Sequence, residues 1–88
     1  MDFLRILWDD PHDPGGNVQH IAEHGLDIDD VEEVLSSPSS RGVSDSSDLP
    51  VVWGYTLEAV YIIVVYQQID EDAIRVVTAY PVPEPYGR

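Results

Sequence analysis

Hydrophobic positions along the chain change their spacing twice, and these changes divide the chain into predicted elements. Residues 3–8 form a short apolar run bounded by acidic residues and a proline, which is typical of a strand. Residues 17–24 then carry apolar side chains at intervals of three and four, as an amphipathic helix does. A second helix is predicted over residues 28–36. Its buried stripe would consist of Ile28, Val31, Val34 and Leu35.

Gly25 separates the two predicted helices. Glycine readily adopts the left-handed conformation that ends many helices. Asp27 follows as a predicted N-cap, because its carboxylate can accept hydrogen bonds from free backbone N–H groups. Asn17 is the predicted N-cap of the first helix. On the outer face of the second helix, we expect Glu32 and Glu33 to point to water.

The second half of the chain has the pattern of a sheet. Residues 51–57, 60–68 and 73–80 are rich in β-branched and aromatic side chains, and short connections favour an antiparallel meander. The middle run is almost wholly apolar, as expected of a strand covered on both faces. In the last run, simple alternation divides the side chains into Ile74, Val76 and Thr78 on one face and Arg75, Val77 and Ala79 on the other.

These elements predict an α+β fold with a short N-terminal strand, two consecutive helices and a three-stranded antiparallel meander. Both helices would pack on one face of the sheet. A chain of 88 residues is expected to form a single domain over 1–88. Residues 36–50 would be a flexible Ser/Asp-rich loop, in which 41–44 could pair briefly as an edge strand, and residues 81–88 a proline-rich tail.

The chain is strongly acidic, and this limits its partners. Four arginines and no lysine face 17 acidic residues, for a net charge of −13. Nucleic-acid binding draws on cations that replace counterions on phosphate, so we expect RNA to bind weakly if at all and DNA not at all. The charge would serve either solubility or the attraction of a basic protein. No signal segment or bilayer-length apolar run is visible, which predicts a cytoplasmic protein without a membrane partner.

Several segments, taken in order, resemble the BrnT-type toxin family of the wider RelE-like ribonuclease group. They are Trp8-Asp9, His20-Ile-Ala-Glu-His24-Gly25, Val31-Glu-Glu-Val-Leu35, Gly54-Tyr-Thr56 and Ile74-Arg-Val-Val-Thr-Ala-Tyr80. The resemblance covers nearly the whole chain. It implies a RelE-like fold and the toxin half of a bacterial toxin–antitoxin pair, which cleaves RNA and is neutralised by a DNA-binding antitoxin.

Four residues would carry that chemistry. RNA cleavage of this kind needs a base, an acid and a cation beside the phosphate. The resemblance implies His24 or His20 as acid and base, Arg75 as the phosphate anchor and Tyr80 as a possible donor. Where basic members carry lysine and many carry arginine, this chain has Glu23 and Tyr80. The sequence therefore leaves open whether the protein is an RNA endonuclease.

Each of these residues also has a simpler interpretation. His20 and His24, four positions apart, share a helix face and would serve equally well as structural side chains. With His12 they could supply metal ligands, but the chain has no cysteine and lacks the spacing of a metalloprotease, so we expect no metal and no cofactor. Arg75 and Tyr80 are an odd number of positions apart, which places them on opposite faces unless a bulge intervenes.

For Arg75, the ordinary alternative is a salt bridge with Asp70, Glu71 or Glu58. The aromatic residues Trp8, Trp53, Tyr55, Tyr61 and Tyr66 are more simply explained by packing than as a platform for stacking bases. The competing hypothesis for function is a non-catalytic interaction module. Its basic partner, a cognate antitoxin or another protein, would bind the acidic helix face formed by Asp29, Asp30, Glu32 and Glu33.

Overall fold

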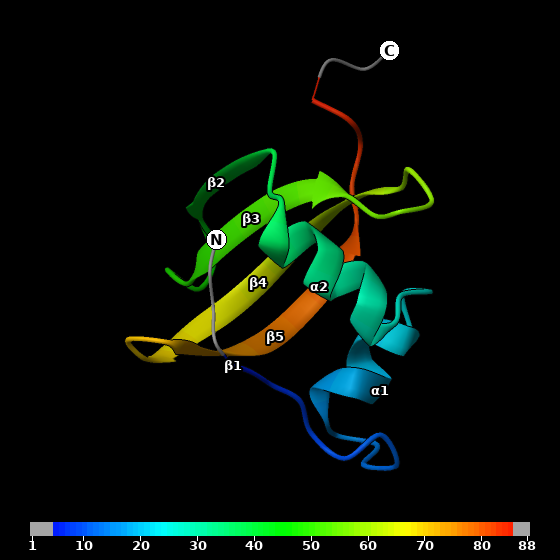
Figure 1. The fold of residues 1–88 in the computed structure, drawn as a ribbon, viewed down its shortest axis with the longest axis vertical. Coiled ribbons are helices and arrows are strands. Elements are labelled where there is room, and N and C mark those ends of the chain that lie inside the picture. The colour runs from blue at the N-terminus through cyan, green and yellow to red at the C-terminus, as the bar shows by residue number, and fades with distance from the viewer. Residues whose placement is uncertain (1–4, 86–88) are drawn as a thin grey trace.

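The computed structural model describes residues 5–85, which form one mixed sheet with two short helices (Figure 1). In chain order the elements are β1 (Arg5–Leu7), α1 (Asn17–Ala22), α2 (Ile28–Ser36), β2 (Ser40–Val43), β3 (Pro50–Tyr55), β4 (Tyr61–Asp70) and β5 (Ala73–Pro81). The strand order is β1-β5-β4-β3-β2, with β1 parallel to β5 and the other pairs antiparallel. Phe3 and Leu4 of the predicted first strand lie outside the described residues.

The predicted fold class is wrong, because the structure is mostly sheet and the sheet has five strands. β1 extends it by pairing in parallel with the start of β5, where Ile6 faces Ile74. β2 adds the opposite edge by pairing with β3 over Ser40–Val43, inside the predicted loop. The addition of β1 depends on backbone hydrogen bonds to residues 68 positions away, whereas β2 and β3 form a hairpin whose paired residues are 7 to 13 positions apart. The strand predicted over residues 3–8 and the possible edge strand over 41–44 correspond to β1 and β2, but the side-chain pattern did not indicate which strands they would join.

One face of the sheet carries the core. α2 lies across this face over β3 and β4, and α1 lies beside β5 (Figure 1). Burial of apolar surface between the helices and this face supplies the main stabilising free energy, about 25 cal/mol per Å². The cluster consists of Ile21, Leu26, Val31, Val34, Leu35, Val52, Ile62, Val64, Tyr66, Ile74, Val76 and Ala79. The opposite face, which includes Val51, Trp53 and Ile63, is called the open face below.

A bulge in β5 reverses the predicted faces of its second half. Val65 pairs with Thr78, but the next residue, Tyr66, pairs with Val76. Val77 is therefore an extra residue without its own partner, and the alternation shifts by one position after it. As a result Ala79 joins Val76 in the core, and Thr78 lies on the face that Val65 occupies. The predicted grouping was wrong for Thr78 and Ala79, because simple alternation assumes a regular strand.

The prediction for α2 is confirmed at both ends. Asp27 is its N-cap and its carboxylate accepts from the backbone N–H of Asp30 at 2.9 Å, while the Asp30 carboxylate accepts from the backbone N–H of Asp27 at 3.0 Å. This reciprocal pair is a capping box. Gly25 has φ +80°, the left-handed conformation expected between the helices. α1 differs from the prediction, since it ends at Ala22 and its N-cap is Gly16 rather than Asn17.

Candidate functional site

Three of the four predicted site residues come together beside α1. His20 lies in the helix, His24 in the turn that follows it, and Tyr80 near the end of β5. The ring centroids of His20 and His24 are 5.6 Å apart, and those of His24 and Tyr80 are 5.7 Å apart. Both histidines are exposed and Tyr80 is half-buried. We call these three residues the histidine–tyrosine cluster, and its side chains can donate, accept and exchange protons.

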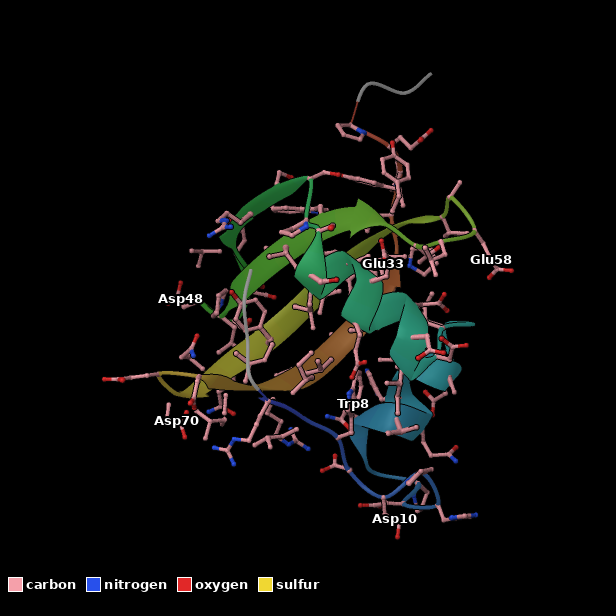
Figure 2. All side chains as sticks on the ribbon, viewed as in Figure 1. Trp8, Asp10, Glu33, Asp48, Glu58 and Asp70 are labelled. Carbon is pink, nitrogen blue, oxygen red and sulfur yellow. The ribbon has the colours of Figure 1, made fainter. Side chains whose placement is uncertain are left out.

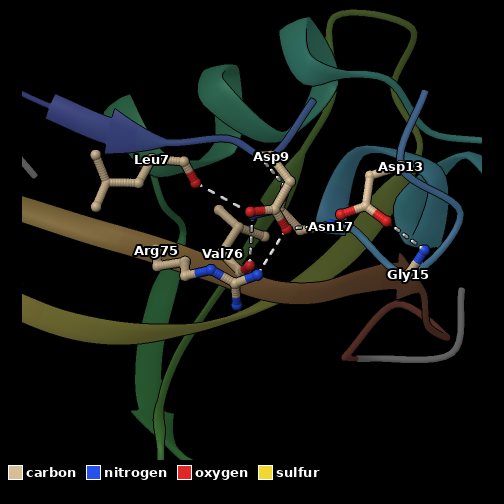
Figure 3. Close-up of polar contacts among 7 residues, drawn as sticks. All are labelled: Leu7, Asp9, Asp13, Gly15, Asn17, Arg75 and Val76. Atoms are coloured by element: carbon tan, nitrogen blue, oxygen red, sulfur yellow. Dashed lines mark hydrogen bonds and ion pairs between the residues drawn. The ribbon is translucent and has the colours of Figure 1, made fainter. Parts of the chain in front are cut away.

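Arg75, the fourth predicted site residue, forms an ion pair outside this cluster. Its guanidinium donates to the carboxylate of Asp9 at 2.6 Å, and this ion pair is partly buried, with side-chain exposures of 39% and 28% (Figure 3). The expected partners Asp70, Glu71 and Glu58 were wrong, because Asp9 is brought to Arg75 by the loop that leaves β1. Asp70 instead accepts from Arg5 at 3.2 Å.

Asn17 holds Asp9 beside Arg75, and no local pattern in the sequence predicts this role. Its side-chain amide donates to the carbonyls of Leu7 at 3.1 Å and Val76 at 2.9 Å (Figure 3). Its side-chain oxygen accepts from the backbone N–H of Asp9 at 2.8 Å, and its own backbone N–H donates to the Asp9 carboxylate, also at 2.8 Å. Asn17 is only 3% exposed. A single buried side chain therefore joins the end of β1, the start of α1 and the middle of β5.

The bulge at Val77 places Arg75 and Tyr80 on the same face, despite their odd spacing. Arg75 pairs with Gln67 and Tyr80 pairs with Ile63, and these two β4 residues point the same way. The two side chains nevertheless take different partners, Asp9 for Arg75 and His24 for Tyr80. The cluster thus contains possible acids and bases, while the cation that RNA cleavage would need beside them is held by a carboxylate.

Exposed carboxylates are distributed over the whole outline of the molecule. Figure 2 shows Asp48 and Asp70 at one side of the molecule, Glu58 at the opposite side and Asp10 at the bottom. The exposed acidic residues within 5–85 are Asp10, Asp13, Glu23, Asp27, Asp29, Asp45, Asp48, Glu58, Asp70, Glu71 and Glu84. Backbone hydrogen bonding from Asp72, with a smaller contribution from Arg5, lowers the pKa of the Asp70 carboxyl and keeps it charged. A net charge of −13 with this distribution repels a polyanion.

The described cations do little to offset this charge. Salt bridges occupy Arg5 and Arg75, each with an aspartate. Arg41 is exposed and forms no ion pair within the described part of the chain, and Arg88 lies outside it. Arg41 pairs in register with Val52, a core-face residue, so it points away from the open face at the sheet edge. Of the three arginines that the structure describes, two are therefore neutralised by aspartates.

For metal binding, His20 and His24 would need a third ligand, and none is placed beside them among the described His, Cys, Asp and Glu residues. His12 lies in the exposed loop before α1, 3.4 Å from the Asp10 carboxylate. Within residues 5–85, no group of three or more His, Cys, Asp or Glu side chains is arranged to hold a metal ion. A metal ion at His20 and His24 would therefore have two imidazole ligands, fewer than the three or four protein ligands of a usual site.

Of the five aromatic residues considered in the sequence, Trp53, Tyr55 and Tyr61 lie on the open face, whereas Trp8 and Tyr66 pack at the core. Trp8 packs against the core, and its indole N–H donates to the Glu32 carboxylate at 3.0 Å. Glu32 is therefore not directed to water as predicted. On the open face, the rings of Tyr55 and Tyr61 are 4.9 Å apart. Trp53 and Tyr80 instead line a separate hollow of about 520 Å³ on the open face, bordered by residues 41–46.

The acidic helix face is also smaller than predicted. Asp30 is engaged in the capping box, and Glu32 accepts from Trp8. Asp29 and Glu33 are the two members of that set for which the structure gives no side-chain hydrogen bond. Asp29 and Glu33 are four positions apart in α2 and therefore lie on the same side of the helix.

Tyr55 provides a test of the tail packing in alkaline solution. Its hydroxyl donates to the Glu84 carboxylate at 2.7 Å, and this hydrogen bond, followed by burial and the charge of Glu84, raises the pKa of Tyr55. A raised folded-state pKa contributes stability that is present below about pH 10 and is lost as the pH rises through the folded-state pKa. In an ultraviolet titration of the phenolate, Glu84→Ala is expected to lower the pKa of Tyr55. The same replacement in a Tyr55→Phe background should leave the curve unchanged, and an identical curve for wild type and Glu84→Ala would contradict the contact.

No helix within residues 5–85 has the length and apolar character needed to cross a membrane. No family model, no curated protein and no solved structure matches the chain.

Proposed function

We propose that this protein is a BrnT-like member of a bacterial toxin–antitoxin type system that acts by binding a basic partner protein rather than by cleaving RNA. The observation that carries the proposal is the ion pair of Arg75 with Asp9 at 2.6 Å. A guanidinium that neutralises a nearby carboxylate is not free to hold a phosphate, and releasing it would leave a partly buried aspartate without its counter-charge.

The charge distribution supports the same proposal. Exposed carboxylates surround the described part of the chain, whereas its arginines are few and two of them are paired. Complementary charge increases the rate at which partners meet and excludes partners of like charge. A protein rich in lysine and arginine, such as a DNA-binding antitoxin, is therefore favoured, and RNA is not.

The second candidate function is that of an RNA endonuclease, and the histidine–tyrosine cluster favours it. His24 lies against both His20 and Tyr80, so one side chain could accept a proton while another donates one. This candidate requires a phosphate anchor other than Arg75, or an RNA that displaces Asp9 from it.

Expression in a bacterial host separates the two candidates. We expect normal growth and intact cellular RNA in cells producing the wild-type protein, and the same in cells producing His24→Ala or Arg75→Ala. Circular dichroism of each purified variant would control for folding. Growth arrest with RNA fragmentation that disappears in folded His24→Ala would overturn the proposal and establish the endonuclease.

A further inference from the structure

An apolar groove lies between α1 and α2, on the side of α1 away from the histidines. It has a volume of about 300 Å³ and is lined by Pro11, Val18, Ala22, Leu26, Asp27, Ile28 and Asp29. Leu26 is buried, Val18 and Ile28 are half-buried, and Pro11 and Ala22 are exposed. The described chain therefore leaves part of this apolar surface in contact with solvent.

The helical repeat explains why α1 presents two different sides. Val18 and Ala22 are four positions apart and share the groove side, whereas His20 contacts His24, and His24 contacts Tyr80. Ile21, between them, is fully buried against the core. The groove is thus separate from the histidine–tyrosine cluster, although both depend on the position of α1.

Hydrogen bonds fix the walls of the groove. The Gln19 side-chain amide donates to the carbonyl of Pro11 at 2.6 Å, which holds the loop before α1 against the helix. The backbone N–H of Leu26 donates to the carbonyl of Ile21 at 3.1 Å, which closes the turn between the helices. The capping box of Asp27 and Asp30 fixes the start of α2. A site with fixed walls loses little conformational entropy when it is filled.

The charged residues that line the groove are both acidic, Asp27 and Asp29. Asp10 and His12 flank Pro11 in the chain, and the Asp10 carboxylate lies 3.4 Å from the His12 ring. None of the lining residues is basic. An apolar floor with a carboxylate rim is complementary to a segment whose apolar side chains are bordered by lysine or arginine.

We infer that this groove is the docking site for a basic amphipathic segment of a partner protein, which inserts its apolar side chains between α1 and α2. The inference rests on the proposed function and adds where the partner binds. Its apolar side chains would contact Val18, Ala22 and Ile28, and its cations would lie beside Asp27 and Asp29. A second copy of this acidic chain would meet like charge at the same rim.

The test is a calorimetric titration of the full chain with a short synthetic amphipathic peptide of leucine and lysine. Ala22→Lys places a cation and added bulk among the apolar residues that line the groove. Because the lysines of the peptide would be repelled and its leucines excluded, binding is expected to weaken about tenfold or more. Ala22→Gln adds bulk without charge and should weaken it less. Glu23→Gln is the matched control, because it makes the same change in net charge on the neighbouring, exposed position outside the lining.

Each outcome has a definite meaning. Selective loss of binding in Ala22→Lys, with near wild-type binding in Glu23→Gln, supports the groove. Equal weakening in both variants, or equally tight binding of a peptide of lysine without leucine, overturns the groove and leaves the proposed function standing. If no basic peptide binds the wild-type protein, the proposed function fails and the inference fails with it.

Discussion

Replacing Asn17 with alanine is expected to lower the free energy of unfolding by about 2–4 kcal/mol, since a buried polar group that loses its partner costs about 1–3 kcal/mol. The replacement removes the donors to the carbonyls of Leu7 and Val76 and the acceptor for the backbone N–H of Asp9. Because these groups belong to two segments that are far apart in the chain, around Leu7 and around Val76, we expect no nearby side chain to replace Asn17.

Urea denaturation followed by circular dichroism would measure the effect. Gln19→Ala is the matched control, because Gln19 lies on the same helix, is exposed and makes a single side-chain hydrogen bond. An exposed contact of this kind is expected to contribute about 0.5 kcal/mol or less. Asn17→Asp retains an acceptor, loses the donors and adds a charge beside Asp9, so its loss should equal or exceed that of Asn17→Ala. A loss for Asn17→Ala no larger than that for Gln19→Ala would contradict the structural role of Asn17.

Local signals in the sequence predicted local structure well. The bounds of α2 follow from its apolar spacing and from Asp27 as N-cap, and Gly25 has the left-handed conformation expected of it. These features depend on residues within a few positions of one another. The number of strands and the mixed pairing could not be obtained in this way, because the residues of β1 pair with residues of β5 that lie 68 positions further along the chain.

The bulge at Val77 is a second feature of the fold that local sequence patterns did not predict. Alternation along β5 is correct up to Val76 and reversed from Thr78 onward. The run from Ala73 to Tyr80 is apolar on both faces, so its composition does not reveal where an extra residue is inserted. The shared face of Arg75 and Tyr80 is a direct consequence of this bulge.

Contacts of the candidate site between residues close in the sequence could be predicted, and contacts between distant residues could not. The four-residue spacing placed His20 near His24, although α1 ends before His24. The partner of Arg75 is 66 positions away in the chain, and the sequence offered several acidic alternatives that were closer. Asn17 appeared only as a predicted helix cap, since nothing in its neighbourhood indicates that its amide reaches Leu7 and Val76.

The pairing of Arg75 with Asp9 changes how the resemblance to BrnT-type toxins is interpreted. Such a toxin would need a cation beside its acid and base, and here the histidine–tyrosine cluster and Arg75 have separate partners. The chain would then retain the protein-binding half of a toxin's role. The apolar groove between α1 and α2, with Asp27 and Asp29 in its lining, is the surface that we assign to that role.

The most direct test of binding to a basic partner rather than to RNA compares two affinities of the wild-type protein. They are its affinities for fluorescently labelled RNA and for labelled polylysine, each measured as the salt concentration is increased. We expect RNA binding no tighter than a Kd of about 10⁻⁴ M at physiological salt, the weak end of non-specific binding. Polylysine should bind at low salt and dissociate as the exposed carboxylates are screened. Tight, salt-sensitive RNA binding that is lost in Arg75→Gln would contradict the account, because Arg75 would then be the phosphate anchor rather than the partner of Asp9.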